Sequence, residues 1–210
     1  MGLLRLLMSA PQLFFLVAVP LLYSVILHEV AHGLCARAFG DDTAQRAGRL
    51  TLNPLPHLDP MGLLMLVCVG FGWAKPVPVN YGRLRPRRPG IFCVALAGCG
   101  TNIFLAVLAL AALQAQLVSA RSVFAIVLEV LARINIILGA FNLIPIPPLD
   151  GSKILLSVLP VEGQRALLRL ERYGSMILIL LLLGGLLDPL IRVAESAVLS
   201  FIGVLFSMYR

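Results

Sequence analysis

The chain has 210 residues, of which 60% are hydrophobic and only 13% are charged, whereas soluble domains average about 45–50% and about 25%. Its mean hydropathy of +0.96 excludes an ordinary soluble domain and predicts a membrane protein. The net charge of +7 favours cytoplasmic anchors over a nucleic-acid site, because arginines crowd two loops beside apolar runs. We therefore expect no nucleic-acid partner. These arginines are Arg37, Arg46 and Arg49 in one loop, and Arg83, Arg85, Arg87 and Arg88 in the other.

Long apolar runs predict an all-α polytopic membrane protein with about 4–6 membrane segments, in a single domain over residues 1–210. Residues 12–39 form the first run. At ~1.5 Å per residue, this run is long enough to cross a ~30 Å hydrocarbon core. It has no small-residue cleavage site, so we expect a retained helix and not a signal peptide.

Residues 43–90 predict a re-entrant region made of a strand, a short helix and a loop. The alternation in RLTLN, residues 49–53, favours a short strand or hairpin, and Asp59 followed by Pro60 favours a helix start. The apolar run 61–71 is too short to span a membrane comfortably. Residues 72–90 are rich in proline, glycine and arginine and predict a loop.

Two further spans are predicted over residues 91–118 and 122–144. The apolar C-terminal helices, residues 175–207, are broken at Asp188 and Pro189. They form either one kinked span or a span followed by a surface helix.

The motif HEVAH, residues 28–32, places ionisable groups inside the first apolar run. His28 and His32 are four residues apart, so on a helix they share one face and can reach one Zn²⁺ at ~2.0–2.1 Å. Glu29 is then placed to act as a general base towards water activated by the metal. The plain alternative is a chance match, but each charged group at bilayer depth costs about 2.5–3.5 kcal/mol by insertion scales. The motif in this setting therefore predicts a metal site.

The segment FNLIPIPPLDG, residues 141–151, follows the predicted span 122–144. Its three prolines cannot continue a helix and force an extended chain. Such backbone is tolerated at membrane depth only where protein buries it or it lines a wet cavity. Asp150 is the candidate third zinc ligand, and its alternative role is to cap the next helix. Asn142 could bind a substrate carbonyl, or it could only satisfy the broken helix backbone.

Together, HEVAHG and NLIPIPPLDG resemble the two hallmark motifs, HExxH and NxxPxPPLDG, of the site-2 protease family of intramembrane zinc metalloproteases. The segments GDDTAQRAGRLTLNPLPHLDPMG and GWAKPVPVN resemble its compact prokaryotic branch, which lacks a PDZ or CBS domain. The resemblance covers about residues 20 to 160. One departure is that Cys99 replaces the proline of the family's AGPxxN segment, whereas Asn102 matches.

This resemblance implies one Zn²⁺ per chain, held by His28, His32 and Asp150, with Glu29 as the general base. It implies hydrolysis of peptide bonds in single-span transmembrane substrates, that is, regulated intramembrane proteolysis in the lipid bilayer. We expect Asn142 and Asn102 to hold carbonyl oxygens. The sequence leaves open a homo-oligomer and two other functions, a membrane zinc transporter and a catalytically inactive membrane scaffold.

The positions of the proposed ligands also constrain the topology. The histidines lie late in the first span and Asp150 lies just past the predicted span 122–144, so these two spans must run in the same direction. Only one full crossing, 91–118, separates them if residues 58–74 enter the membrane and return. With the arginine loop at 83–88 in the cytoplasm, the active site of this multi-pass cell-membrane protein faces the cytoplasmic side.

Four other polar residues have weaker signals. His57 and Asp59 could form a second metal pair, but their i, i+2 spacing beside prolines favours a turn and a helix start. Glu129 and Arg133 are four residues apart in a span and predict an intrahelical ion pair.

Overall fold

The computed structural model describes residues 7–69 and 72–207. Within these residues the regular structure is helical, and no β-strand is present. Four helices are long and apolar enough to cross a membrane, which confirms the all-α polytopic prediction. They are α2 (Pro11–Ala38), α5 (Arg87–Gln114), α6 (Val123–Asn142) and α10 (Asp188–Ser207).

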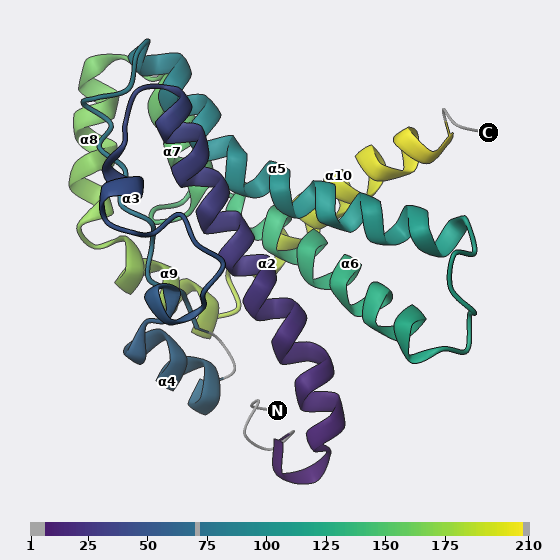
Figure 1. Cartoon of the computed structure of the whole chain (residues 1–210). Coiled ribbons are helices and arrows are strands. Elements are labelled where there is room, and N and C mark those ends of the chain that lie inside the picture. The colour runs from purple at the N-terminus through teal and green to yellow at the C-terminus, as the bar shows by residue number, and fades with distance from the viewer. Residues whose placement is uncertain (1–6, 70–71, 208–210) are drawn as a thin grey trace.

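The long helices pack closely where their facing residues are small. Figure 1 shows α2 crossing α5 and α6, with α10 beside them and the shorter helices gathered at one side. Ala106 of α5 and Ala140 of α6 are fully buried and share a cluster with Ile202 of α10. In a lipid environment, helices associate mainly through van der Waals contact, and small side chains let their backbones approach. The bundle is thus built around alanine contacts between α5 and α6.

The helix ends follow from local sequence signals. The side chain of Ser122 accepts a hydrogen bond from the Ala125 N–H at 3.2 Å and caps the start of α6. Helix α5 begins at Arg87, inside the region predicted as loop, because Pro89 falls in the first helical turn, where its missing N–H costs nothing. Helix α6 ends at Asn142, just before the prolines that cannot continue it.

The region between α2 and α5 contains three short helices instead of a strand. They are α3 (Thr43–Arg46), the 3₁₀ helix η1 (Leu55–His57) and α4 (Pro60–Val69). Helix α4 begins at Pro60 as predicted, and residues 70 and 71 of the predicted apolar run lie outside the described residues.

The strand predicted at residues 49–53 is wrong, because side chains there satisfy the backbone locally. The Thr51 hydroxyl accepts from the Asn53 N–H, and the Asn53 side chain accepts from the Leu55 N–H, both at 3.1 Å. These short turns replace the ladder of hydrogen bonds that a strand would need. The alternating pattern of RLTLN therefore marks a folded loop.

The chain leaves this loop at His57 and returns to it at Lys75. The Lys75 N–H donates to the His57 carbonyl at 2.9 Å. A Cβ added at Gly62 would lie 2.0 Å from the Trp73 carbonyl oxygen. The two arms of this excursion therefore lie side by side, and Gly62 permits their contact.

The remaining helices are α7 (Asp150–Val158), α8 (Val161–Glu171) and α9 (Gly174–Leu183). The apolar C-terminal segment is interrupted before Asp188, as predicted, and α9 is too short to count among the four candidate spans. The ion pair predicted between Glu129 and Arg133 is wrong: both side chains are exposed, and no ion pair within the described part of the chain joins them.

Gly62→Ala should destabilise the protein, because the new methyl group would meet the Trp73 backbone at 2.0 Å and separate the two arms. We expect a loss of about 1–3 kcal/mol, as for overpacked sites, measured by thermal unfolding in detergent. Gly203→Ala is the matched control, since a Cβ there meets nothing within 4 Å. An equal melting temperature for the two variants would contradict the contact.

Candidate metal centre

Three side chains from two helices converge at one point. His28 and His32 of α2 have their Nε2 atoms 3.0 Å apart, and Oδ2 of Asp150 lies 3.1 Å from each of them. A tetrahedral ion with bonds of ~2.0–2.1 Å separates neighbouring ligand atoms by about 3.3 Å. The triangle therefore has the size of one face of a zinc site and leaves a fourth position for water or substrate.

Because residue 98 is a glycine, its side chain does not fill the space in front of this triangle. A Cβ added at Gly98 would lie 2.4 Å from His32 Nε2 and 2.6 Å from His28 Nε2. These lengths exceed the ~2.0–2.1 Å of a bond from histidine nitrogen to zinc, but they are much shorter than any contact between unbonded atoms, so no side chain could occupy this space. The cradle that a methyl group would fill, together with two imidazoles and one carboxylate, fits Zn²⁺.

The proline-rich segment carries Asp150 to the histidines. Helix α7 begins at Asp150, and a Cβ at Gly151 would lie 2.2 Å from the Leu143 carbonyl oxygen, so only glycine lets this turn close on the end of α6. On the other side of the segment, Gly174 at the start of α9 approaches Pro147 closely enough that a Cβ would lie 2.9 Å from its carbonyl carbon. Tight backbone packing on both sides therefore fixes the carboxylate.

The Asp150 carboxylate faces both imidazoles, with its Oδ2 3.1 Å from each Nε2. The Cys99 thiol also donates to Asp150 Oδ2 at 3.7 Å. Cys99, the residue that departs from the family pattern, thus lies inside an intact α5 and contacts the candidate ligand.

Both histidines are oriented by acceptors on α5. The His32 Nδ1–H donates to the Val94 carbonyl at 2.7 Å, and the His28 Nδ1–H donates to Oδ1 of Asn102 at 2.6 Å. Because each Nδ1 carries the proton, each Nε2 lone pair is available to a metal.

A buried polar network stands behind His28 and reaches α2 and α6. The Asn102 amide donates to Oδ1 of Asn135 at 2.8 Å, and the Asn135 amide donates to the Ser24 hydroxyl at 2.8 Å. All three side chains are buried. The sequence analysis missed Asn135 and Ser24, although isolated polar residues in spans are a recognised sign of function.

Glu29 is half-buried next to the histidines and contacts the loop after α4. Its Oε2 accepts from the Val77 N–H at 2.7 Å. Arg49 holds the same loop by donating to the Lys75 carbonyl at 2.6 Å. A stretch of backbone without regular secondary structure, residues 75–79, therefore lies beside the carboxylate that the sequence predicts to be the base.

The other predicted residues have local partners. The Asn142 amide donates to the Leu138 carbonyl at 3.0 Å. Nε2 of His57 is 2.9 Å from the Thr51 carbonyl, and Oδ1 of Asp59 accepts from the Gly62 N–H at 2.8 Å at the start of α4. His57 and Asp59 therefore serve a turn and a helix start, and neither belongs to the metal-binding group.

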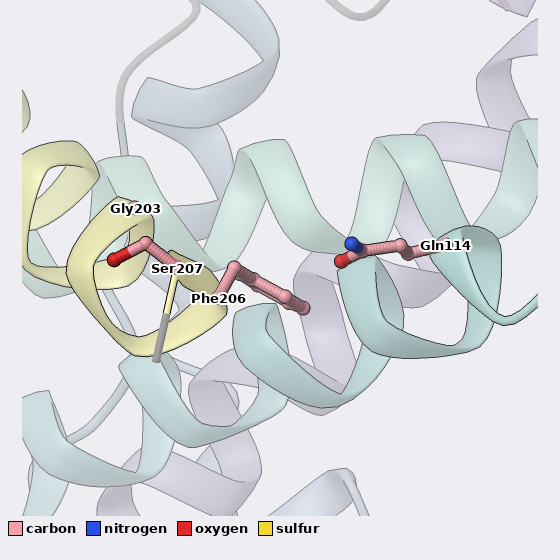
Figure 2. Close-up of a pocket in the computed structure, with 4 residues that line it drawn as sticks. All are labelled: Gln114, Gly203, Phe206 and Ser207. Atoms are coloured by element: carbon pink, nitrogen blue, oxygen red, sulfur yellow. The ribbon is translucent and has the colours of Figure 1, made fainter. Parts of the chain in front are cut away.

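A pocket of about 230 Å³ lies away from this group. Figure 2 shows Gln114 at the end of α5 facing Phe206 and Ser207 of α10. None of its lining residues belongs to the metal-binding group or contributes to the network behind His28.

Comparisons with known proteins agree with this centre. The model of Peptidase family M50 matches residues 114–185, which include Asp150. A candidate zinc metalloprotease of Bacillus subtilis (strain 168), YwhC, is 34% identical over 200 residues, which cover 90% of this chain and 91% of that protein. The candidate zinc metalloproteases named Rip2 are similar too. That of Mycolicibacterium smegmatis is 36% identical over 84% of this chain and 70% of its own length, and that of Mycobacterium tuberculosis (strain H37Rv) is 34% identical over 83% and 69%.

No solved structure matches the chain, and the comparisons bring no PDZ or CBS domain. The long alignments and the four apolar helices confirm the resemblance seen in the two sequence motifs. The chain belongs to the site-2 protease family, Peptidase family M50, and is a membrane zinc metalloprotease.

Proposed function

We propose that this protein is an intramembrane zinc endopeptidase that cuts peptide bonds in the transmembrane helices of single-span substrates, as in regulated intramembrane proteolysis. One observation carries the proposal. Three ligand atoms, from His28, His32 and Asp150, lie within 4.8 Å of one another, and two of them are on a helix apolar enough to span a membrane.

In this proposal His28, His32 and Asp150 hold one Zn²⁺. When bound, the ion supplies Lewis acidity, which polarises a carbonyl and lowers the pKa of water towards ~7. Glu29 is the general base. The Val77 N–H fixes its Oε2 at 2.7 Å, and its second oxygen, Oε1, is the atom to which we assign proton transfer from the attacking water to the leaving amine.

The two asparagines take different roles in the proposal. The Asn102 side chain is fully buried and its oxygen is bonded to His28, so it supports a positioning role and not contact with substrate. Asn142 is half-buried and uses one amide N–H on Leu138. Since an amide has two N–H donors, the other is the one that we assign to a substrate carbonyl oxygen.

The segment between α3 and α5 forms the proposed route of the substrate to the site. We propose that residues 58–74 enter the bilayer and return, because His57 and Lys75 are hydrogen-bonded at the base of that excursion. A substrate helix must unwind before hydrolysis, since its carbonyls are otherwise bonded within the helix. The backbone carbonyls of residues 76–79 beside Glu29 are the groups that we assign to binding the unwound segment. The N–H groups of residues 75–79 are mostly unavailable, because those of Lys75 and Val77 are bonded to His57 and Glu29 and the two prolines have none. Arginines near the start of α5 support a cytoplasmic position for this end of the proposed single domain.

Glu29→Gln should abolish cleavage while leaving the three ligands in place. We expect a loss of at least ~10²–10⁴-fold in rate with a single-span reporter substrate in proteoliposomes. Zinc measured by elemental analysis should stay near one per chain in both proteins. Metal flux that survives the substitution would support a transporter. A zinc-loaded wild type that binds substrate helices without cutting any of them would support a scaffold.

Gly98→Ala should prevent zinc binding, because the methyl group would occupy the space 2.4–2.6 Å from both Nε2 atoms. Gly100→Ala, two residues along the same helix, meets nothing within 4 Å and is the matched control. The measurement is zinc content after equilibration with a buffered metal solution. Equal zinc in the two variants would place the metal elsewhere.

Asn135→Leu should weaken zinc binding although Asn135 touches none of the ligands. It removes the acceptor that orients Asn102 and, through it, His28, and such outer contacts are worth about 10–100-fold in metal affinity. Asn135→Gln keeps both an amide donor and an amide acceptor and should retain more of the affinity than the leucine variant. Competition with a zinc chelator measures both, with thermal unfolding of the metal-free proteins as the control for packing. Wild-type affinity in the leucine variant would remove Asn135 from the site.

A further inference from the structure

Helix α8 (Val161–Glu171) lies outside the packed bundle. None of its residues is buried, and Figure 1 shows it at one edge of the molecule, next to the beginning of α5. Its sequence is nevertheless amphipathic: Leu167 and Leu170 lie on the face away from the arginines, and Leu168 lies at the edge of the arginine face. A helix of this kind needs an environment that is polar on one side and apolar on the other.

One face of α8 carries three arginines. Arg165, Arg169 and Arg172 are spaced four and three residues apart, at the end of and just after α8, so they lie within about 60° of one another around the helix axis. All three are exposed. Of the two nearby acids, Glu162 is exposed and Glu171 is paired with Lys153. The face therefore keeps a net positive charge.

Two further arginines lie near the start of α8. Arg87 and Arg88 are exposed in the first turn of α5. Arg88 donates to the carbonyl of Leu159, two residues before α8, at 3.3 Å. The arginine surface thus consists of Arg87, Arg88, Arg165, Arg169 and Arg172.

Both ends of α8 adjoin apolar helices. Its start contacts the first turn of α5, a candidate span. Its end leads directly into α9, whose Met176, Leu180 and Leu183 are 56%, 61% and 70% exposed and need lipid to cover them. Tyr173, between the two helices, is 54% exposed, and tyrosine is enriched at membrane–water interfaces. These positions place α8 at the level of the lipid headgroups.

We propose that the arginine surface binds the phosphate headgroups of anionic phospholipids. Guanidinium groups pair with phosphate oxygens in two-pronged geometry, and a basic residue near a membrane surface gains roughly fivefold in affinity for anionic lipid. The proposal depends on charge and membrane depth, and it stands whether or not the protein is a protease.

Quenching of a tryptophan by brominated lipids tests the proposal on the full chain. Tyr173→Trp in a Trp73→Phe background places the only tryptophan beside the arginine surface. In detergent–lipid micelles at low salt, brominated phosphatidylglycerol should bind at this position at least ~10-fold more tightly than brominated phosphatidylcholine. The preference should shrink as salt rises to ~1 M.

The variants are built in that same background. Replacing all five arginines of the surface by Gln should bring the ratio to within about twofold of one, whereas replacing them by Lys keeps the charge and should keep most of the preference. Arg121→Gln, an exposed arginine between α5 and α6, is a control that should change nothing. Circular dichroism and zinc content confirm that each variant is folded.

Equal quenching by the two lipids in the parent protein would overturn the proposal. So would a preference that survives the substitution of all five arginines by Gln. Salt-sensitive binding of a soluble polyglutamate peptide, without any lipid preference, would assign the surface to an acidic protein partner and would also reject the lipid assignment.

Discussion

The constraint on which the rest of the structure depends is the cost of placing ionisable side chains among membrane helices. An acidic or basic group there costs about 2.5–3.5 kcal/mol even by the mildest scales. His28, His32 and Asp150 share this cost, because each lies 3.0–3.1 Å from the other two and a bound cation would balance the carboxylate. The acceptors behind the imidazoles are equally necessary, since a buried Nδ1–H without a partner would be a further penalty.

This constraint explains the positions of the glycines and prolines around the centre. The chain reaches the polar centre through backbone that is not helical. In a membrane, the unpaired polar groups of such backbone have to be covered by protein. Leu149 of the proline-rich segment packs in one cluster with Leu178 of α9 and with Leu187, the residue just before α10. Gly98 and Gly151 remove side chains at the two places where α5 and the end of α6 press against the centre. The helices therefore meet closely enough to exclude lipid while leaving room for an ion.

Much of the fold could be predicted because hydrophobic length and motif spacing are local signals. The spans and the convergence of HEVAH with Asp150 follow from runs of apolar residues and from two motifs. The folded loop at residues 49–53 could not be predicted, because Thr51 and Asn53 use their side chains to form turns, and the alternating pattern alone does not reveal these hydrogen bonds. The prediction of an ion pair between Glu129 and Arg133 was wrong for another reason. Helical spacing brings two charges within reach, but exposed partners gain little from pairing.

Asn102 and Asn142 show why the residue type alone does not give a role in such a site. Both were expected to hold substrate carbonyls, yet burial separates them: Asn102 is fully enclosed and its amide is engaged by His28 and Asn135, whereas Asn142 is half-buried at the end of α6. A side chain with both ends occupied cannot also bind substrate, since its donors and acceptors are used. It can transmit orientation, because the Asn135 acceptor decides which way the Asn102 amide points. The direction of that amide in turn decides which nitrogen of His28 faces the metal.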